Sequence, residues 1–152
     1  MSGEELKIKI SELFPSTVFE ETGEWVTVMI APEEWLHVAN QLRFTPGLDF
    51  DFLFCLTCID WKTHLTMVYH LSSTTYRHTI VVKSKLNRDK PEIETVSRLW
   101  RTAEFHEREA YELFGVNFLN HPDLRLLILP DGWEGKNPLR KDYEDPINII
   151  KL

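Results

Sequence analysis

A pair of cysteines is the first candidate for chemistry in this sequence. Cys55 and Cys58 have the C-x-x-C spacing of zinc sites and of thioredoxin-like dithiols. A dithiol of that kind normally lies at a helix start, where the thiolate is stabilised, but these cysteines lie within FDFLFCLTCID, an apolar, strand-like segment. Side chains three residues apart on a strand point to opposite faces of the sheet. The pattern therefore favours cysteines that pack in the core.

The second candidate is a charged run, His106-Glu107-Arg108-Glu109-Ala110. Zinc proteases bind their metal with two histidines four residues apart on a helix and use an adjacent glutamate as base. Here Ala110 stands in the place of the second histidine. Glu107 and Glu109 do not form a carboxylate pair, because two helical steps turn their directions about 200° apart. We expect ion pairs at the surface or at an interface.

Other catalytic and cofactor motifs are absent from the sequence. The remaining histidines lack a serine in a G-x-S-x-G context, which argues against a hydrolase. There is no G-x-G-x-x-G for a dinucleotide and no G-x-x-x-x-G-K-S/T for a triphosphate. Two cysteines are fewer than the four thiolates that an iron–sulfur cluster usually requires. We expect any electron-carrying metal to lie in another protein.

The composition is that of one globular domain. The chain has 152 residues, 43% hydrophobic and 27% charged, which is enough to bury a core without disulfides. Its formal charge of −7 disfavours nucleic acid as a partner. The longest apolar run, 52–56, is far short of the ~20 residues that cross a bilayer, and the first residues lack an apolar signal core. The sequence predicts a soluble chain that begins inside the cell, without direct membrane insertion.

Hydrophobic periodicity predicts three helices and five extended segments. The helices are expected at 4–14, from Pro32 to a stop before Pro46, and at 92–114 with Gly115 as its C-terminal cap. The extended segments are expected at 17–20, 25–30, 50–61, 65–71 and 76–83. In the last helix, Glu104, Arg108 and Glu112 are spaced as two i,i+4 ion pairs. This order predicts an α+β fold: a two-layer α/β sandwich with a mixed, mostly antiparallel sheet and helices on one face.

The last stretch of the chain shows neither the helical nor the strand-like periodicity of hydrophobic residues. Half of the eight prolines lie there, at positions 122, 130, 138 and 146. Its leucines and Trp133 are nevertheless too apolar for a disordered tail. We therefore divide the chain into an α+β domain of residues 1–115 and an extended, irregular C-terminal arm of residues 116–152. We expect the arm to pack on another subunit; the alternative is that it wraps its own domain.

Opposite charges and large anchors are interleaved along this arm. The charges are Asp123, Arg125, Arg140, Lys141, Asp142 and Asp145, and the anchors are Trp133, Leu139 and Tyr143. Interleaved charges suit a specific protein interface because they set the register and reject wrong partners. Aromatic and arginine side chains are the usual anchors of buried contacts. The arm is thus predicted to be a subunit-docking surface.

Many of these residues form an ordered series. It runs Glu107-Arg108-Glu109, Tyr111-Glu112-Leu113-Phe114-Gly115-Val116, His121-Pro122-Asp123-Leu124-Arg125, Trp133, and Pro138-Leu139-Arg140-Lys141-Asp142-Tyr143. The series resembles the signature of the 30 kDa subunit of respiratory complex I, known in bacteria as the C-type subunit of NADH-quinone oxidoreductase. It departs from the family pattern at Asn120, Leu126 and Glu144, which bears on single contacts only.

The resemblance implies a scaffold without chemistry of its own. Family members bind no flavin, iron–sulfur cluster or quinone, so that NADH, FMN, the clusters and quinone belong to partner subunits. The chain would lie in the hydrophilic arm of a proton-pumping NADH:quinone oxidoreductase. There it would brace the large quinone-site subunit, which is of the 49 kDa type, and its iron–sulfur neighbour. It would be peripheral, on the cytoplasmic side of the inner membrane.

The resemblance also implies interface residues, while no catalytic, cofactor-binding or metal-binding residue is predicted. By this hypothesis arginines and Lys141 hold carboxylates and carbonyls of the partner, because guanidinium groups make paired hydrogen bonds. The predicted interface residues are Glu107, Arg108, Glu109, His121, Pro122, Asp123, Arg125, Trp133, Pro138, Leu139, Arg140, Lys141, Asp142 and Tyr143.

Three alternatives remain at this point. Relatives of this subunit also occur in membrane-bound hydrogenases and in coenzyme F420- or ferredoxin-dependent complexes, so the electron donor is open. A freestanding redox or zinc protein would use Cys55 and Cys58. An independent soluble enzyme would run alone, near its mass of 18.0 kDa.

Overall fold

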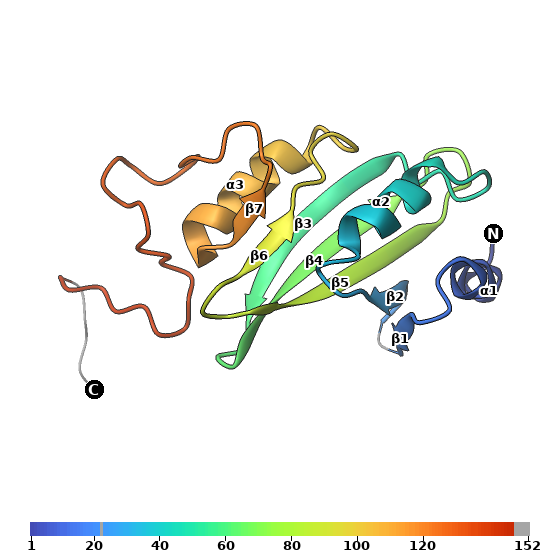
Figure 1. Ribbon diagram of the computed structural model, residues 1–152, viewed down its shortest axis with the longest axis horizontal. Helices are drawn as coiled ribbons and strands as arrows, with labels where there is room; N and C mark the ends of the chain where they lie inside the picture. Colours follow the sequence, from blue (N-terminus) through green and yellow to red (C-terminus); the bar gives the residue numbers. More distant parts are fainter. Residues whose placement is uncertain (22, 148–152) are drawn as a thin grey trace.

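A five-stranded mixed sheet carries the fold (Figure 1). In the computed structural model, which describes residues 1–21 and 23–147, the strand order is β1-β2-β5-β4-β3. The strands are β1 (Val18–Glu20), β2 (Val26–Met29), β3 (Phe52–Asp60), β4 (His64–Ser72) and β5 (Thr79–Asn87). The three long strands form an antiparallel meander, β1 is antiparallel to β2, and β2 is parallel to β5.

Three helices cover one face of this sheet: α1 (Gly3–Leu13), α2 (Trp35–Phe44) and α3 (Ala103–Phe114). Trp35 of α2 is fully buried, and its ring centroid lies 4.5 Å from that of Tyr69 on β4. Trp100, just before α3, stacks on Trp35 and donates its indole N–H to the carbonyl of Phe50 at 2.8 Å. The predicted α+β fold, with a mixed and mostly antiparallel sheet, is confirmed.

The helix predicted over 92–114 is wrong for its first part. Glu92–Glu94 form strand β6, which pairs in parallel with β7 (Asn117–Leu119). The alternation in this segment, with Ile93 buried, suits a strand after Pro91. The backbone N–H of Val96 donates to the Glu107 carboxyl, which holds the following turn outside the helix. The helix therefore begins only at Ala103.

Further boundaries differ from the prediction. The last long strand spans Thr79–Asn87 instead of 76–83; it starts late because the backbone N–H of Ser73 donates to the carbonyl of His78 and closes a turn. Val116 and Phe118 lie beyond the predicted boundary at residue 115, yet both are buried in the core. The irregular arm therefore begins after β7.

The two cysteines lie on opposite faces of β3. Cys58 belongs to the core and is 5% exposed, whereas Cys55 is half-buried, and both are free thiols. Burial raises the pKa of the Cys58 thiol to about 12. The expected packing of Cys58 in the core is confirmed, and its thiolate is strongly disfavoured near neutral pH.

Gly115 ends α3 as predicted. Its φ is 81°, and its N–H donates to the Tyr111 carbonyl at 2.9 Å, as in a left-handed helix cap. A Cβ at this position would lie 2.6 Å from the Asn137 amide nitrogen. The arm therefore also packs closely on the end of this helix.

Substituting this glycine tests that packing. Gly115→Ala is expected to lower the free energy of unfolding by more than the about 1 kcal/mol that left-handed strain costs an alanine. Gly132→Ala is the matched control, because Gly132 also has a positive φ, 91°, but no atom within 4 Å of an added Cβ. Urea denaturation of both variants measures the difference. Equal losses of unfolding free energy would show that the arm does not sterically hinder a side chain at residue 115.

Candidate functional site

Two buried charges on α3 face the arm, which in the structure comprises residues 120–147. Arg108 and Glu112 are one helical turn apart, and each is at most 6% exposed. The guanidinium of Arg108 donates to the carbonyls of Arg125 at 3.1 Å and Leu126 at 2.5 Å. The sequence predicted an i,i+4 ion pair here; instead, each charge binds backbone of the arm. The reason is that the arm, which has no ladder of its own, needs partners for its peptide groups.

Glu112 binds the next three residues of the arm. Its carboxylate accepts the N–H groups of Leu127 at 2.8 Å, Ile128 at 2.9 Å and Leu129 at 3.2 Å. The residue is 1% exposed, so the carboxylate has lost its water, and these charge-assisted bonds replace it. One side chain thereby orders three successive peptide groups.

Fixing the backbone in this way turns apolar side chains outward. Leu127 is 37% exposed and Ile128 is 67% exposed. Phe105 of α3 is 54% exposed, and its ring lies 5.8 Å from the Arg108 guanidinium that binds the arm. We call Phe105, Leu127 and Ile128 the α3–arm patch. Large apolar side chains that are exposed in this way are typical of protein interfaces.

The arm attaches a second time at the C-terminal end of α3. Leu139 donates its N–H to the Leu113 carbonyl at 3.1 Å, and Arg140 donates to the Phe114 carbonyl at 2.6 Å. Arg140 also reaches the Arg88 carbonyl at 3.3 Å. The last carbonyls of a helix lack partners within it, and here the arm supplies them.

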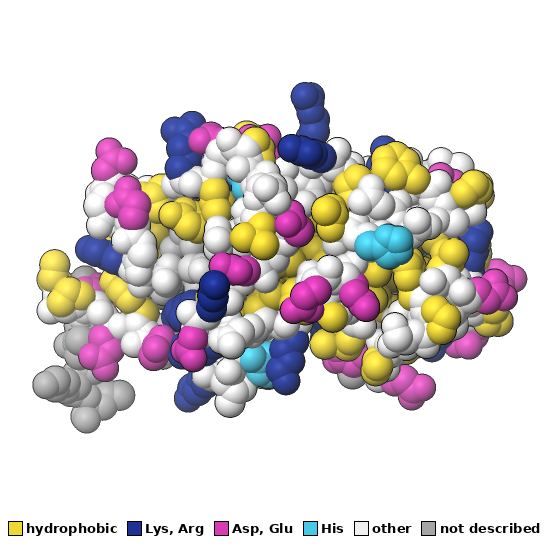
Figure 2. Space-filling view, in the orientation of Figure 1, with side chains coloured by type: hydrophobic (Ala, Val, Ile, Leu, Met, Phe, Trp, Pro, Cys, Tyr) yellow, Lys and Arg dark blue, Asp and Glu magenta, His cyan; other side chains and the backbone are white. Residues whose placement is uncertain are grey.

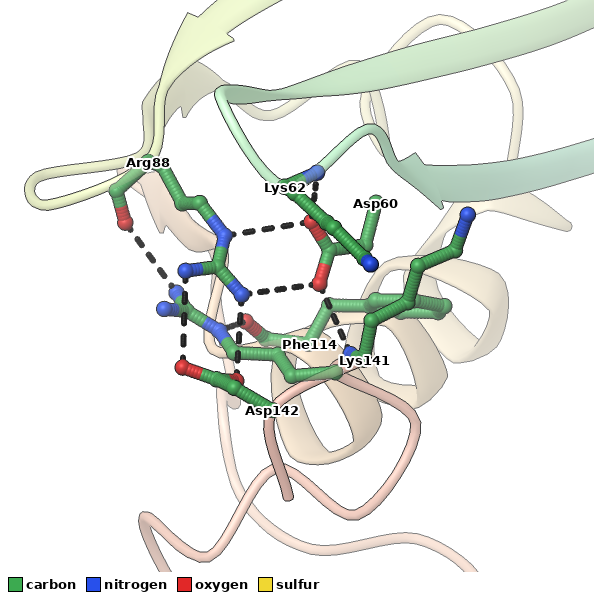
Figure 3. A network of polar contacts seen from close by, with 7 residues as sticks. Asp60, Lys62, Arg88, Phe114, Lys141 and Asp142 are labelled. Carbon is green, nitrogen blue, oxygen red and sulfur yellow. Dashed lines mark hydrogen bonds and ion pairs between the residues drawn. The ribbon is translucent and has the colours of Figure 1, made fainter.

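An ion-pair network joins this part of the arm to the sheet (Figure 3). Asp60, at the end of β3, accepts two bonds from the Arg88 guanidinium, at 2.9 and 3.1 Å. It also accepts the N–H groups of Lys62 and Lys141, both at 2.8 Å. Arg88 reaches the Asp142 carboxylate at 3.0 Å. One buried carboxylate therefore holds a strand end, a loop and the arm together.

The Asp60 carboxylate is stabilised in its ionised form. Hydrogen bonds from Arg88, and then those from the Lys141 and Lys62 N–H groups, hold the pKa of Asp60 well below its ordinary value. Its side chain is 1% exposed, so solvent screens the pair with Arg88 little. Arg88 also lowers the pKa of Asp142, but that carboxylate is 67% exposed and its pair contributes less.

A second buried carboxyl lies beneath the start of the arm. Glu107 accepts the Val96 N–H at 2.9 Å and the Thr95 hydroxyl at 2.5 Å, and burial raises the pKa of Glu107 to about 7. The His121 ring lies 3.8 Å away, but its Nε2 donates to the Glu104 carbonyl and its Nδ1 accepts the Asp123 N–H. These bonds assign a neutral imidazole. With both side chains inaccessible to solvent, Glu107 and His121 act as internal ties.

The predicted interface residues thus fall into two groups. Glu107, Arg108, His121 and Arg140 point inward; Arg108 and Arg140 bind carbonyls of their own chain, where the sequence analysis expected groups of a partner. The others are exposed or half-buried at the surface, and their contact with another protein stays a prediction. They are Glu109, Pro122, Asp123, Arg125, Trp133, Pro138, Leu139, Lys141, Asp142 and Tyr143.

Sequence reasoning missed Asp60 and Arg88 and assigned Glu112 to an ion pair. Asp60 lies 81 residues from Lys141, the arm residue that it binds. The one available signal was a carboxylate at the end of an otherwise apolar strand. Such a group needs partners when buried, but periodicity does not identify them.

Other kinds of site were sought in residues 1–21 and 23–147. Within these ranges no group of three or more histidine, cysteine, aspartate or glutamate side chains is arranged to hold a metal ion. The same part of the chain has no helix with the length and apolarity required to cross a bilayer.

Replacing Glu112 is expected to loosen the arm and leave α3 folded. In Glu112→Gln a neutral amide with one acceptor oxygen faces three N–H donors, at a cost of about 2 kcal/mol. Hydrogen exchange at residues 127–129 should accelerate by about tenfold or more. Glu109→Gln, on the exposed side of the same helix, is the control. Unchanged protection in the Glu112 variant would contradict the assignment.

The Asp60 network predicts a dependence of stability on pH. The pKa of Asp60 is lower in the folded than in the unfolded chain, so its contribution is present above the unfolded value of about 4 and declines as the pH falls below it. Asp60→Asn should cost about 2 kcal/mol at neutral pH, and this difference from wild type should shrink in acid. Denaturant titrations across this range measure it.

Asp142→Asn is the matched control for this experiment. It removes the exposed partner of the same arginine, so a much smaller loss is expected. The two variants behaving alike, or an Asp60→Asn loss that is constant with pH, would refute the role given to Asp60.

Comparisons with known proteins agree with this architecture. The family model described as "Respiratory-chain NADH dehydrogenase, 30 Kd subunit" matches residues 28–146. The C/D-type subunit of the NADH-quinone oxidoreductase of Phocaeicola vulgatus is 46% identical over 123 residues, which are 80% of this chain and 23% of that protein. The C-type subunit of the F(420)H(2) dehydrogenase of Methanosarcina mazei is 44% identical over 100 residues, 64% of this chain and 63% of that protein.

A solved structure shows the same fold. It is a chain of the membrane-bound sulfane sulfur reductase, an archaeal respiratory membrane complex, with a TM-score of 0.79 and 27% identity. The match covers 93% of this chain and 85% of that one. The family model begins within β2 and takes in α2, the three long strands, α3 and almost all of the described arm. The chain therefore belongs to the family of the 30 kDa subunit of respiratory-chain NADH dehydrogenase.

Proposed function

We propose that this chain is a non-catalytic subunit of the hydrophilic arm of a proton-pumping NADH:quinone oxidoreductase. It is peripheral, on the cytoplasmic side of the membrane, and braces the large quinone-site subunit and its iron–sulfur neighbour. NADH, FMN, the clusters and quinone are bound by partner subunits. Family membership and the relatives named for NADH-quinone oxidoreductase support this proposal.

The observation that carries the proposal is the way in which Arg108 and Glu112 hold the arm. Five peptide groups, from residue 125 to residue 129, are bound by two buried charges. An arm held in this way presents Leu127 and Ile128 in one conformation, so little conformational entropy is lost on binding. A rigid, outward-facing apolar patch fits a scaffold role.

The relatives also supply a second candidate for the electron donor of the complex. The relative from Methanosarcina mazei belongs to an F(420)H(2) dehydrogenase, and the solved neighbour belongs to a sulfane sulfur reductase. The α3–arm patch would serve an equivalent subunit in such a complex equally well. The choice between donors therefore depends on the partner subunits.

Purification from native membranes tests both the proposed subunit role and the proposed electron donor. The chain should co-purify with a quinone-site subunit, and the assembly should oxidise NADH; oxidation of reduced coenzyme F420, ferredoxin or hydrogen instead would select the second candidate. A chain that runs alone near 18.0 kDa would contradict both. A reversible dithiol or stoichiometric zinc on the folded chain would favour a freestanding protein.

A charge in the α3–arm patch should block assembly without unfolding the chain. Ile128→Asp is expected to reduce the amount of co-purified quinone-site subunit, and membrane quinone reduction with it, by about tenfold or more. The reason is that an apolar side chain that the partner would bury is replaced by a charge. Ile8→Asp is the control, because Ile8 is 60% exposed on α1. Normal assembly of the Ile128 variant would show that the patch is not the contact.

A further inference from the structure

The sheet has a second face that no helix in the described part of the chain covers. Tyr69 of β4 points to the helices, so His70 points to the other side. His70 lies there in an aromatic cluster: its ring centroid is 5.8 Å from that of Trp25 and 5.6 Å from that of Phe54. Phe52 adds a fourth ring, 6.0 Å from Phe54. We call this side of the sheet the open face.

The open face is a mixed surface with exposed aromatic side chains at both ends. Trp25 and Phe52 are 43% and 46% exposed, and at the other end Trp61, 54% exposed, stacks on His64. Between these ends Thr57 is exposed and Cys55 and Ile59 are half-buried. Thr66, Val68 and Val81 are buried between their neighbours. Tryptophan is among the residues that contribute most to protein interfaces, and these rings are held in place by the sheet beneath them.

The charges on the open face are of one sign along the three long strands. The outward positions of β3, β4 and β5 hold no aspartate or glutamate, whereas β5 turns Lys83 and Lys85 to this side. Glu20 of β1 pairs with Lys83 at 3.1 Å, and Lys85 is exposed. The chain as a whole carries −7, and Figure 2 shows carboxylates spread over the side on which α2 and α3 lie. On the three long strands the open face therefore combines exposed aromatic side chains with lysine and has no carboxylate.

We propose that the open face is a second protein interface, whose partner presents apolar side chains together with a carboxylate. This carboxylate complements Lys85 on the central strand β5, and the partner's apolar side chains cover Trp25, Phe52 and Trp61. A second copy of this chain fits worse, because symmetric pairing of like faces brings lysines together. Anionic lipid surfaces are usually bound by clusters of four or more cations, roughly twice what β5 offers here.

This interface goes beyond the proposed function, since it lies on the side of the sheet opposite α3. A scaffold with two such surfaces joins two proteins. The α3–arm patch would hold one of them, and the open face would hold the other. The two surfaces can therefore be tested separately.

Photo-crosslinking in the assembled native complex tests the open face. A benzophenone amino acid replaces Thr57, which is exposed at the middle of β3, and the control carries it at Ile8. A carbodiimide, which joins amines to carboxylates, probes Lys85 in the same preparation. The proposal expects residue 57 to label one protein subunit, and Lys85 to be joined to an aspartate or glutamate of that subunit.

The other outcomes overturn the proposal. The stated partner would be excluded if residue 57 labelled lipid, a second copy of this chain or nothing at all. If Lys85 were not joined to an aspartate or glutamate of that subunit, the complementary carboxylate would be excluded. Thr57→Arg should also lower recovery of that subunit by about tenfold or more, while Ile8→Arg leaves it unchanged. If Ile128→Asp disrupts assembly but Thr57→Arg does not, the open face fails and the proposed function stands.

Discussion

The carboxylate of Glu112 is the contact on which the course of the arm depends. A segment without helix or strand leaves its peptide groups without partners, and most such segments are free to adopt many conformations. Here one buried carboxylate binds three successive N–H groups, while Arg108, one turn earlier, binds the two preceding carbonyls. A cation for acceptors and then an anion for donors, in that order along α3, also set the direction of the arm.

The second attachment follows the same principle at the end of the helix. Arg140 and the Leu139 N–H satisfy carbonyls that α3 cannot pair internally. Asp60 then connects the arm to the ends of β3 and, through Arg88, β5, which lie on either side of β4. The arm thereby contacts α3 at two points and joins the second of them to the sheet. This geometry favours a rigid body whose surfaces keep fixed relative positions, which the proposed bracing role requires.

Buried charged side chains in this chain bind backbone groups more often than they bind each other. Arg108, Glu112 and Arg140 bind peptide groups, and Glu107 binds the turn before α3. Removing ions from water is costly, and several backbone hydrogen bonds to each ion offset that cost.

The sequence by itself determined the elements whose side chains repeat locally: α1, α2, the long strands, and Gly115 as the end of α3. It also determined the family, through the series from Glu107 to Tyr143. Periodicity reports which side chains are buried, and burial within one element needs no knowledge of the rest of the fold. Tertiary structure alone decided that residues 92–94 pair with β7, that Glu107 delays the start of α3, and that Asp60 meets Lys141. Each of these depends on a polar partner brought from a distant part of the chain, and the partner of a buried polar group is chosen by position in space, not by spacing in sequence.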